Sequence, residues 1–326
     1  MNRRDAVLAL LALGAAPFAA VAQQSGKVWR IGVLRPAPDD AGFRQNFDPF
    51  RQALRKLGFT EGANLAIEYR VRPGTAVEIL ALADDLVRSK VDAIFAVASV
   101  AVSAAAKSTT SIPIVALDLE SDPIAEGFAA NLARPGGNVT GLFLDFPGMS
   151  GKWIQLLKES VPKLARVAVL WDPATGPTVF KGAEEAASSM RLQLLRLEVR
   201  GPADFARAFQ SAAAQKAQAL LVLSSPVFNS ARKELAESAM KHRLPTMMPF
   251  PGFADDGGLM AYGPHLASLY GHAGGIVAKI LKGARPGEIP IERPRRFELA
   301  INLKTAKALG ITIPQSVLLG ADRVIE

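Results

Sequence analysis

The segment RIGVLRP at residues 30–36 returns in the second half of the chain as RVAVLWDP at residues 166–173. Three more segments return in the same order and at similar distances along the chain: LAIEYR (65–70) as LRLEVR (195–200), DAIFAVAS (92–99) as QALLVLSS (218–225), and IPIV (112–115) as LPTM (244–247). Each match is weak by itself, because apolar strands resemble one another. Four matches in one order predict an internal duplication, and hence two lobes of the same topology.

Short apolar segments alternate with longer amphipathic segments in the first of these halves. The segments predicted as strands are 28–34, 65–69, 93–98, 114–117 and 139–142, and those predicted as helices are 42–57, 75–89, 100–109 and 123–133. Strands that are apolar almost throughout are expected where helices cover both faces of a parallel sheet. The alternation therefore predicts an α/β protein made of two doubly wound, Rossmann-like lobes.

Three breaks rich in glycine and proline interrupt the second half of the chain. They lie at residues 146–148, 250–258 and 283–287, and we expect a strand at 259–262, a helix at 265–282 and a strand at 297–301 around them. We interpret the breaks as three crossings between the lobes, which together form a hinge. This interpretation assigns residues 27–142 and 258–284 to the first lobe, and residues 143–257 and 285–326 to the second.

The first 22 residues have the three-part layout of a secretory signal peptide. Arg3 and Arg4 begin it, an uncharged apolar run follows from Ala6, and the small-residue motif AVA ends it at Ala22. Gly14 interrupts the run, which is also shorter than the roughly 20 residues that span a bilayer. We therefore expect cleavage after Ala22 and a mature protein free in the periplasm. The arginine pair leaves both general and twin-arginine export open.

The composition excludes several classes of chemistry. With 326 residues, 49% of them hydrophobic, the chain is that of an ordinary globular protein, and it contains no cysteine. Disulfides, thiolate metal sites and cysteine nucleophiles are therefore absent. The net charge of +8 is spread along the chain, and its densest run, RPRR at 293–296, is short, so we expect no nucleic-acid partner. We expect no metal site either, because only three histidines are present.

Candidate ligand-binding residues follow from the predicted architecture. In open parallel sheets, ligands bind beyond the carboxyl ends of the strands, where helices begin and their free N–H groups attract anions. Two facing lobes therefore predict a cleft lined by the loops that follow the strands. The candidates at these ends are Arg35, Ser99, Asp118, Ser121, Asp122, Asp145, Trp171, Asp172, Ser224, Ser225 and Tyr262.

Most of these candidates also have a purely structural interpretation. Ser99, Ser225 and Asp122 stand where helix N-caps are expected, and a cap is compatible with a ligand contact at the same helix end. Asp118 is placed either to bind a ligand amine or to cap a turn. Trp171 follows a strand directly, so it is placed either to stack on a planar ligand or to pack within its own lobe.

No catalytic motif stands beside these candidates. The chain contains no GxGxxG, GxSxG or HExxH pattern, so we expect no cofactor and no enzyme activity. Two alternatives remain open: a two-lobed enzyme that uses Asp118, Asp122 and Asp145 as its acid and base, and a ligand-sensing module for a membrane partner. A ligand-responsive DNA regulator is disfavoured, because no helix-turn-helix segment precedes Trp29.

Several longer motifs resemble one known family. They are WRIGVL (29–34), LG (57–58) with EGxNLxIEY (61–69), LARPGGNVTG (132–141), GLMAYG (258–263), ILKG (280–283) and FELxINLKTAKxLG (297–310). The chain resembles the substrate-binding proteins of ABC transporters, in the family that includes tryptophan- and tyrosine-binding members. The resemblance implies a type 1 periplasmic-binding fold. It also implies that the protein captures a small molecule and delivers it to the permease subunits. We expect a monomer, and a ligand such as an amino acid or a related small acid.

Two loops depart from the pattern of this family. Members often carry a Gly-Thr-Pro-Ala-like loop after the third strand, where this chain has Ala98-Ser99-Val100-Ala101. They often carry Asn-Pro after the sixth strand, where this chain has Asp172-Pro173. Both loops are expected to face the ligand, so the ligand is not restricted to an aromatic amino acid.

Overall fold

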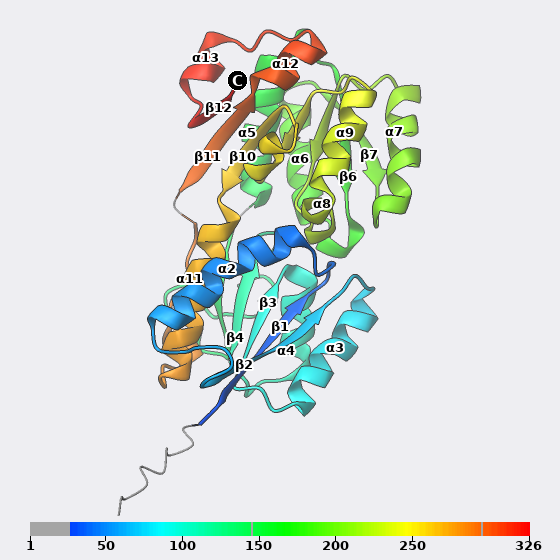
Figure 1. Ribbon diagram of the computed structural model, residues 1–326. Coiled ribbons are helices and arrows are strands. Elements are labelled where there is room, and N and C mark those ends of the chain that lie inside the picture. Colours follow the sequence, from blue (N-terminus) through cyan, green and yellow to red (C-terminus); the bar gives the residue numbers. More distant parts are fainter. Residues whose placement is uncertain (1–26, 145, 295) are drawn as a thin grey trace, which may run out of the picture.

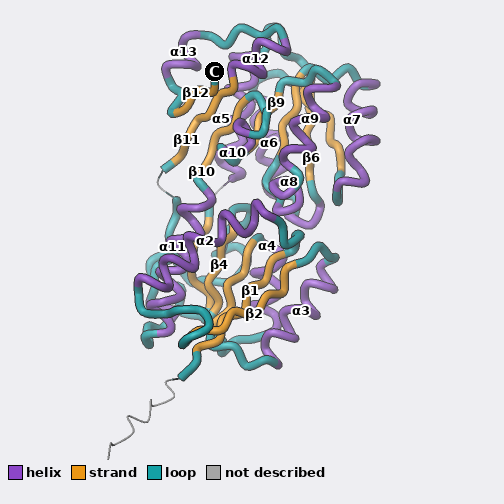
Figure 2. Tube along the Cα trace, in the orientation of Figure 1, coloured by secondary structure: helices purple, strands orange, loops and turns teal. Residues whose placement is uncertain are grey.

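The computed structural model describes residues 27–144, 146–294 and 296–326, which form two α/β lobes stacked one on the other (Figure 1). The predicted signal peptide and Asp145 lie outside the described residues. Each lobe is built around one sheet with helices on both faces, as the tube view shows (Figure 2). Among the described residues, no helix is long and apolar enough to cross a membrane.

The sheet of the first lobe has five parallel strands in the order β2-β1-β3-β4-β5. The strands are β1 (Trp29–Arg35), β2 (Leu65–Val71), β3 (Ala93–Val97), β4 (Ile114–Asp118) and β5 (Val139–Phe143). Its helices are α2 (Ala41–Lys56), α3 (Ala76–Arg88), α4 (Ser99–Ser108) and α11 (Leu266–Leu281). Helices α2 and α11 pack together on one face of the sheet, and α3 and α4 pack together on the other (Figure 1).

The sheet of the second lobe has seven strands in the order β12-β11-β10-β9-β8-β6-β7. They are β6 (Arg166–Trp171), β7 (Gln193–Glu198), β8 (Ala219–Val222), β9 (Thr246–Met248), β10 (Met260–Pro264), β11 (Phe297–Asn302) and β12 (Arg323–Ile325). Strand β11 runs antiparallel to β10, and the other pairs are parallel. The order β7-β6-β8-β9-β10 repeats that of the first sheet, which confirms the predicted duplication.

Helices and short 3₁₀ turns connect the strands of the second lobe. The helices are α5 (Phe146–Ser160), α6 (Thr178–Ser189), α7 (Phe205–Ala214), α8 (Pro226–Ser230), α9 (Arg232–Lys241), α10 (Gly252–Asp255), α12 (Leu303–Leu309) and α13 (Gln315–Leu319). The 3₁₀ turns are η1 (Pro173–Thr175) and η2 (Pro202–Asp204). A third, η3 (Pro286–Glu288), lies against the first lobe, next to β5.

The predicted helix at residues 123–133 is wrong. This segment forms successive turns, in which the Phe128 N–H donates to the carbonyl of Pro123 at 2.8 Å. Gly127 has a φ of +74°, which takes the backbone into the left-handed region after a single turn. A helix cannot continue through that conformation.

The lobe assignment of residues 258–264 is also wrong. Strand β10 pairs with β9 and β11, so it completes the second sheet and not the first. It takes the position beside β9 that β5 takes beside β4, because each half of the duplication needs a fifth strand at this edge. The chain returns to the first lobe only with α11, so the second crossing lies between Pro264 and Leu266.

The third crossing also lies further along the chain than predicted. The Thr140 hydroxyl donates to the carbonyl of Ile289 at 2.8 Å, and the Glu292 N–H donates to the carbonyl of Gly141 at 2.9 Å. Residues 289–292 therefore lie along β5 in the first lobe, and the chain crosses between Glu292 and Phe297. Three crossings join the lobes, as expected, but two of them are displaced from the Gly- and Pro-rich breaks.

A close helix contact holds α11 on the first lobe. A Cβ atom added at Gly274 would meet the carbonyl oxygen of Phe50 at 2.6 Å, so only glycine permits this approach of α11 to α2. Beside this contact, the rings of Phe47, Phe95 and Tyr270 pack with centroid separations of 5.6 to 6.4 Å. The contact brings Tyr270, from the second half of the sequence, to the cleft end of the first sheet.

Candidate functional site

The carboxyl ends of the strands in the two lobes face one another, as the architecture predicts. A small cavity of about 40 Å³ lies where they meet, and we call it the seam cavity. The first lobe lines it with Arg35, Val97, Ala98, Leu117, Leu119 and Glu120, the second with Ser224, Ser225, Pro226, Asn229 and Phe250, and helix α11 with Leu266 and Tyr270.

Among the described residues, two side-chain hydrogen bonds join the lobes directly at this seam. The Ser224 hydroxyl donates to Oε1 of Glu120 at 2.5 Å. The guanidinium of Arg35 donates to Oγ of Ser230 at 3.0 Å. The lobes are therefore in contact through polar side chains, and the structure shows a closed arrangement.

Glu120 is the most unusual group at the seam. Its side chain is buried, and its Oε2 atom has no hydrogen-bond partner among the described residues. Burial, and next the negative charge of Asp118, raise the pKa of Glu120 to about 8. A buried carboxylate oxygen without a partner is costly, so this atom is suited to receive a donor from a ligand.

Asp118 shapes the loop that carries Glu120. Its Oδ1 accepts the N–H groups of Glu120 and Ser121 at 3.0 and 3.1 Å, and its Oδ2 accepts the Ser121 hydroxyl at 2.5 Å. Complete burial raises the pKa of Asp118. Both oxygens are satisfied within the loop, so the turn-capping interpretation accounts for this residue.

Asp172 has the equivalent place in the second lobe. Its Oδ1 accepts the N–H of Ala174 at 3.0 Å, and its Oδ2 accepts the Ser225 hydroxyl at 2.7 Å. Burial raises the pKa of Asp172 as well. Ser225 also accepts the N–H of Val227 at 3.1 Å, which confirms it as the N-cap of α8.

The loop after β3 contains a strained alanine. The N-cap of α4 is Ala98, with φ of 74° and ψ of 155°, a region used almost only by glycine. The expected cap at Ser99 is therefore wrong: Ser99 is the first residue of the helix, and the N-cap residue, Ala98, offers no side-chain hydrogen bond. The strain sits directly on the seam cavity, which Ala98 lines.

Asp122 and Arg35 take part in local contacts. Oδ1 of Asp122 accepts the N–H of Ile124 at 2.8 Å, so it caps the turn at 123–126 while remaining exposed. Arg35 is buried, its guanidinium lies 4.7 Å from the ring centroid of Phe43, and it also donates to the carbonyl of Pro38. Arg35 therefore does not lie in solvent, and its cation bridges the lobes through Ser230.

Trp171 and Tyr262 pack away from the seam. The indole Nε1 of Trp171 donates to the carbonyl of Gly176 at 2.9 Å, and the indole ring lies 5.7 Å from that of Phe180 in the same lobe. The Tyr262 ring packs 6.1 Å from that of Phe297. Neither residue is among the described residues that line the seam cavity.

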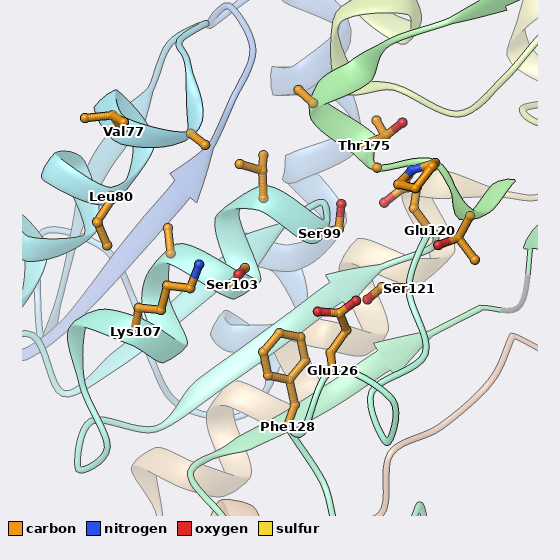
Figure 3. A pocket seen from close by; sticks show the side chains of 17 residues that line it. Val77, Leu80, Ser99, Ser103, Lys107, Glu120, Ser121, Glu126, Phe128 and Thr175 are labelled. Carbon is orange, nitrogen blue, oxygen red and sulfur yellow. The ribbon is translucent and has the colours of Figure 1, made fainter. Parts of the chain in front are cut away.

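A larger pocket, which we call the outer groove, adjoins the seam cavity (Figure 3). It has a volume of about 380 Å³, and Glu120 lines both spaces. Helix α4 contributes Ser99, Val100, Ser103, Ala104 and Lys107, and helix α3 contributes Ala76, Val77 and Leu80. The rest of the lining is Ser121, Glu126 and Phe128 from the first lobe and Ala174–Thr178 from the second.

Sequence reasoning missed Glu120, Asn229 and Tyr270 at the seam. Glu120 stands two residues after the end of β4 in the polar run DLESD, so its position after a strand was an available signal. Asn229 and Tyr270 lie inside helices, where only the folded arrangement shows what they face. Among the described residues, no group of histidine and carboxylate side chains is arranged to hold a metal ion.

Solved structures share the arrangement of the two lobes. A conserved domain protein from Vibrio cholerae matches with a TM-score of 0.82 and 24% identity, over 91% of this chain and 100% of that one. An ABC domain from Streptococcus pneumonia in complex with L-Trp matches with a TM-score of 0.80 and 23% identity, over 91% and 99%. A ligand-free, open substrate-binding protein from Clostridium difficile scores 0.61 at 23% identity, over 92% and 99%.

Sequence comparison also finds substrate-binding proteins. A tyrosine-binding protein of Clostridioides difficile (strain R20291) is 24% identical over 264 residues, which cover 80% of this chain and 75% of that protein. The family model for ABC transporter substrate binding protein matches residues 30–325. Because this match spans nearly all of the described chain, the protein belongs to the family of ABC transporter substrate-binding proteins.

Proposed function

We propose that this chain is an exported binding protein that captures a solute of the amino-acid class between its lobes and delivers it to an ABC permease. The observation that carries the proposal is Glu120, a buried carboxylate at the seam whose Oε2 atom has no partner among the described residues. A ligand ammonium group that donates to this oxygen satisfies it and stabilises the ionised form of the carboxyl group.

The charges at the seam favour an amine over an acid. Three carboxyl groups are buried there, on Asp118, Glu120 and Asp172, and the pKa of each is raised by burial. The buried cation, Arg35, already donates to Ser230 and Pro38. A solute that carries only negative charge raises these pKa values further and gains no charge-assisted hydrogen bond, whereas an ammonium group stabilises the ionised form of Glu120.

Closure of the hinge couples binding to transport. A solute stabilises the closed form only by its greater affinity for that form. To shift the ratio of closed to open forms from about 1:99 to 99:1, this preference must reach about 5.5 kcal/mol. Two or three charge-assisted hydrogen bonds, at roughly 1.5–3 kcal/mol each, reach that value. The closed pair of lobes then offers the permease one composite surface.

The proposed cellular role follows from the N-terminal segment. Residues 1–22 have the layout of a signal peptide, and we place the mature chain in the periplasm as a monomer that meets its permease at the membrane. The tyrosine-binding relative and the structure with bound L-Trp support a solute of the amino-acid class.

A thermal-shift screen followed by calorimetry tests the proposal. The purified protein is titrated with amino acids, amines, small acids, nucleosides and sugars, and a true ligand at about 100 times its Kd adds about 2.7 kcal/mol of stability. Glu120→Gln should weaken binding of that ligand about 10- to 100-fold, because a charge-assisted hydrogen bond is lost. Glu159→Gln, at an exposed position on α5, is the control. Tight binding of an acid or sugar that is insensitive to Glu120→Gln contradicts the proposal.

A further inference from the structure

One face of helix α4 carries a line of polar side chains into the outer groove. Ser99, Ser103 and Lys107 all line the groove and follow one another at intervals of four residues, so they share a helix face (Figure 3). At 1.5 Å per residue, the line from Ser99 to Lys107 is about 12 Å long. The groove therefore extends well beyond the seam.

The two ends of this line carry opposite charges. At the seam end, Glu120 is buried with its Oε2 atom unpartnered among the described residues, and the Glu126 carboxylate points towards Ser121 (Figure 3). At the far end, the Lys107 ammonium points towards Ser103 and has no ion-pair partner in the described part of the chain. A solute with an amine at one end and an acid at the other matches this polarity.

Apolar side chains flank the line of polar side chains on both sides. Val77 and Leu80 of α3 lie on one side of α4, and Phe128 of the turn region lies on the other (Figure 3). These side chains give a hydrophobic surface to the middle of a bound solute, where burial of apolar area contributes roughly 25 cal/mol per Å².

The two spaces differ in what they are able to hold. The seam cavity, at about 40 Å³, has room for a few water molecules, since each needs roughly 10–15 Å³. The outer groove, at about 380 Å³, falls in the range of roughly 300–1,000 Å³ that is typical of small-molecule pockets. A solute held at Glu120 in this closed arrangement therefore extends into the groove.

We propose that the outer groove is a second subsite and that the solute is a dipeptide with an apolar second residue. Its ammonium group binds Glu120, its apolar side chain lies against Leu80 and Phe128, and its carboxylate meets Lys107. This assignment rests on the proposed function, and it names the solute class for the same cleft.

The length of the line of polar side chains favours a dipeptide over a free amino acid. A free amino acid carries its ammonium and carboxylate on one carbon, so these groups lie closer together than the two ends of a dipeptide. A dipeptide extends to about 7 Å, at 3.3–3.6 Å per residue. The Lys107 side chain leans towards the N-terminus of α4 and so shortens the gap of about 12 Å measured along the helix.

Isothermal titration calorimetry tests the subsite with matched ligands. The purified protein is titrated with Ala-Leu, Ala-Phe and Gly-Val, with the C-terminal amide of each, and with the free amino acids. We expect wild type to bind each peptide acid about fivefold more tightly than its amide, as an exposed ion pair of about 1 kcal/mol gives. In Lys107→Gln, acid and amide should bind equally, at the affinity of the wild type for the amide.

A matched variant separates this effect from a general change in charge. Lys56 lies, like Lys107, in the last turn of a first-lobe helix, and it does not line the groove. Lys56→Gln should keep the fivefold preference. Equal affinity of wild type for acid and amide, or an unchanged preference in Lys107→Gln, overturns the subsite.

The outcome also separates this inference from the proposed function. If free amino acids bind in a manner that depends on Glu120 and the peptides do not bind, the second subsite is wrong and the proposed function stands. If no peptide or amino acid binds with dependence on Glu120, both are wrong.

Discussion

The hydroxyl group of Ser224, in the second lobe, donates to Oε1 of Glu120, in the first lobe, at 2.5 Å, and both residues are buried. One oxygen of the carboxylate is thus committed to holding the lobes together, while the other has no partner among the described residues. The same group therefore takes part in closure and is available to a ligand. The protonation state of Glu120 therefore affects both closure of the lobes and ligand binding.

The first prediction concerns stability and pH. Glu120 has a pKa of about 8 in the folded protein, raised from an ordinary value of 4.5. Between these values the folded state keeps a proton that the unfolded chain has lost, so the free energy of unfolding falls as the pH rises from about 4.5 to 8. The slope approaches about 1.4 kcal/mol per pH unit for this one group.

Urea unfolding at a series of pH values measures this slope. Glu120→Gln should flatten it, and the raised pKa values of Asp118 and Asp172 leave a residual slope of the same sign. A wild-type protein whose stability rises steadily over this interval, or a variant with an unchanged slope, contradicts the assignment of the raised pKa to Glu120.

The second prediction concerns proton release on binding. When a solute ammonium group binds Glu120, the positive charge lowers the pKa of the carboxyl group, and near pH 7 the protonated acid gives up its proton. Affinity should therefore increase as the pH rises towards 8. Calorimetry at pH 7 in buffers of different ionisation enthalpy should show close to one proton released per solute bound. Heats that do not depend on the buffer are inconsistent with an ammonium group at Glu120.

The strand topology could be predicted because local sequence patterns indicate it. Strands β1 and β6 are apolar almost throughout, and their neighbours recur in the same order, so both the parallel sheets and the duplication follow from the sequence. The helix expected at 123–133 failed on a single residue, Gly127, whose positive φ ends the helical path. Apolar spacing alone does not show which glycine takes that conformation.

The lobe that receives β10 was not predictable from its own residues. The run DDGG at 255–258 marks a turn in the chain, but the free sheet edge beside β9 decides where the next strand pairs. The residues of the site were difficult to predict for the same reason. Tyr270 reaches the seam only because α11 packs on α2 through Gly274, and no local pattern around Tyr270 encodes that contact.

The third prediction concerns the strained residue at the seam. Ala98 has a φ of 74° and a ψ of 155°, a conformation that costs an L-residue roughly 1–3 kcal/mol. Ala98→Gly should relieve this strain and, after the greater entropy of glycine in the unfolded chain is subtracted, raise the free energy of unfolding by about 1 kcal/mol. Chemical denaturation measures the change.

A second alanine in the same helix is the control for this substitution. Ala101 is buried within α4, where glycine is unfavourable, so Ala101→Gly should lower the stability by about 1 kcal/mol or more. Opposite signs for the two substitutions support strain at Ala98. A loss of stability in both excludes it.

The fourth prediction concerns the hydrogen bond between the lobes. Ser224→Ala removes the donor to Oε1 of Glu120 and leaves both carboxylate oxygens without a partner, which costs about 1–3 kcal/mol in the closed form. We expect the lobes to separate so that water solvates the carboxylate, because opening the hinge costs less free energy than burying both oxygens without a partner. Small-angle X-ray scattering should show a larger radius of gyration for the ligand-free variant than for the ligand-free wild type.

Addition of the solute restores the compact form if Glu120 also binds the ligand, because the ammonium group replaces the lost donor. The control is Ser189→Ala, since Ser189 is exposed at the end of α6 and its hydroxyl donates to the carbonyl of Ala186 in the same helix. Its radius of gyration should match that of the wild type with and without solute. If Ser224→Ala stays as compact as wild type without solute, the bond to Glu120 does not hold the lobes closed, and the open and closed forms are governed by contacts elsewhere along the seam, beginning with that of Arg35 to Ser230.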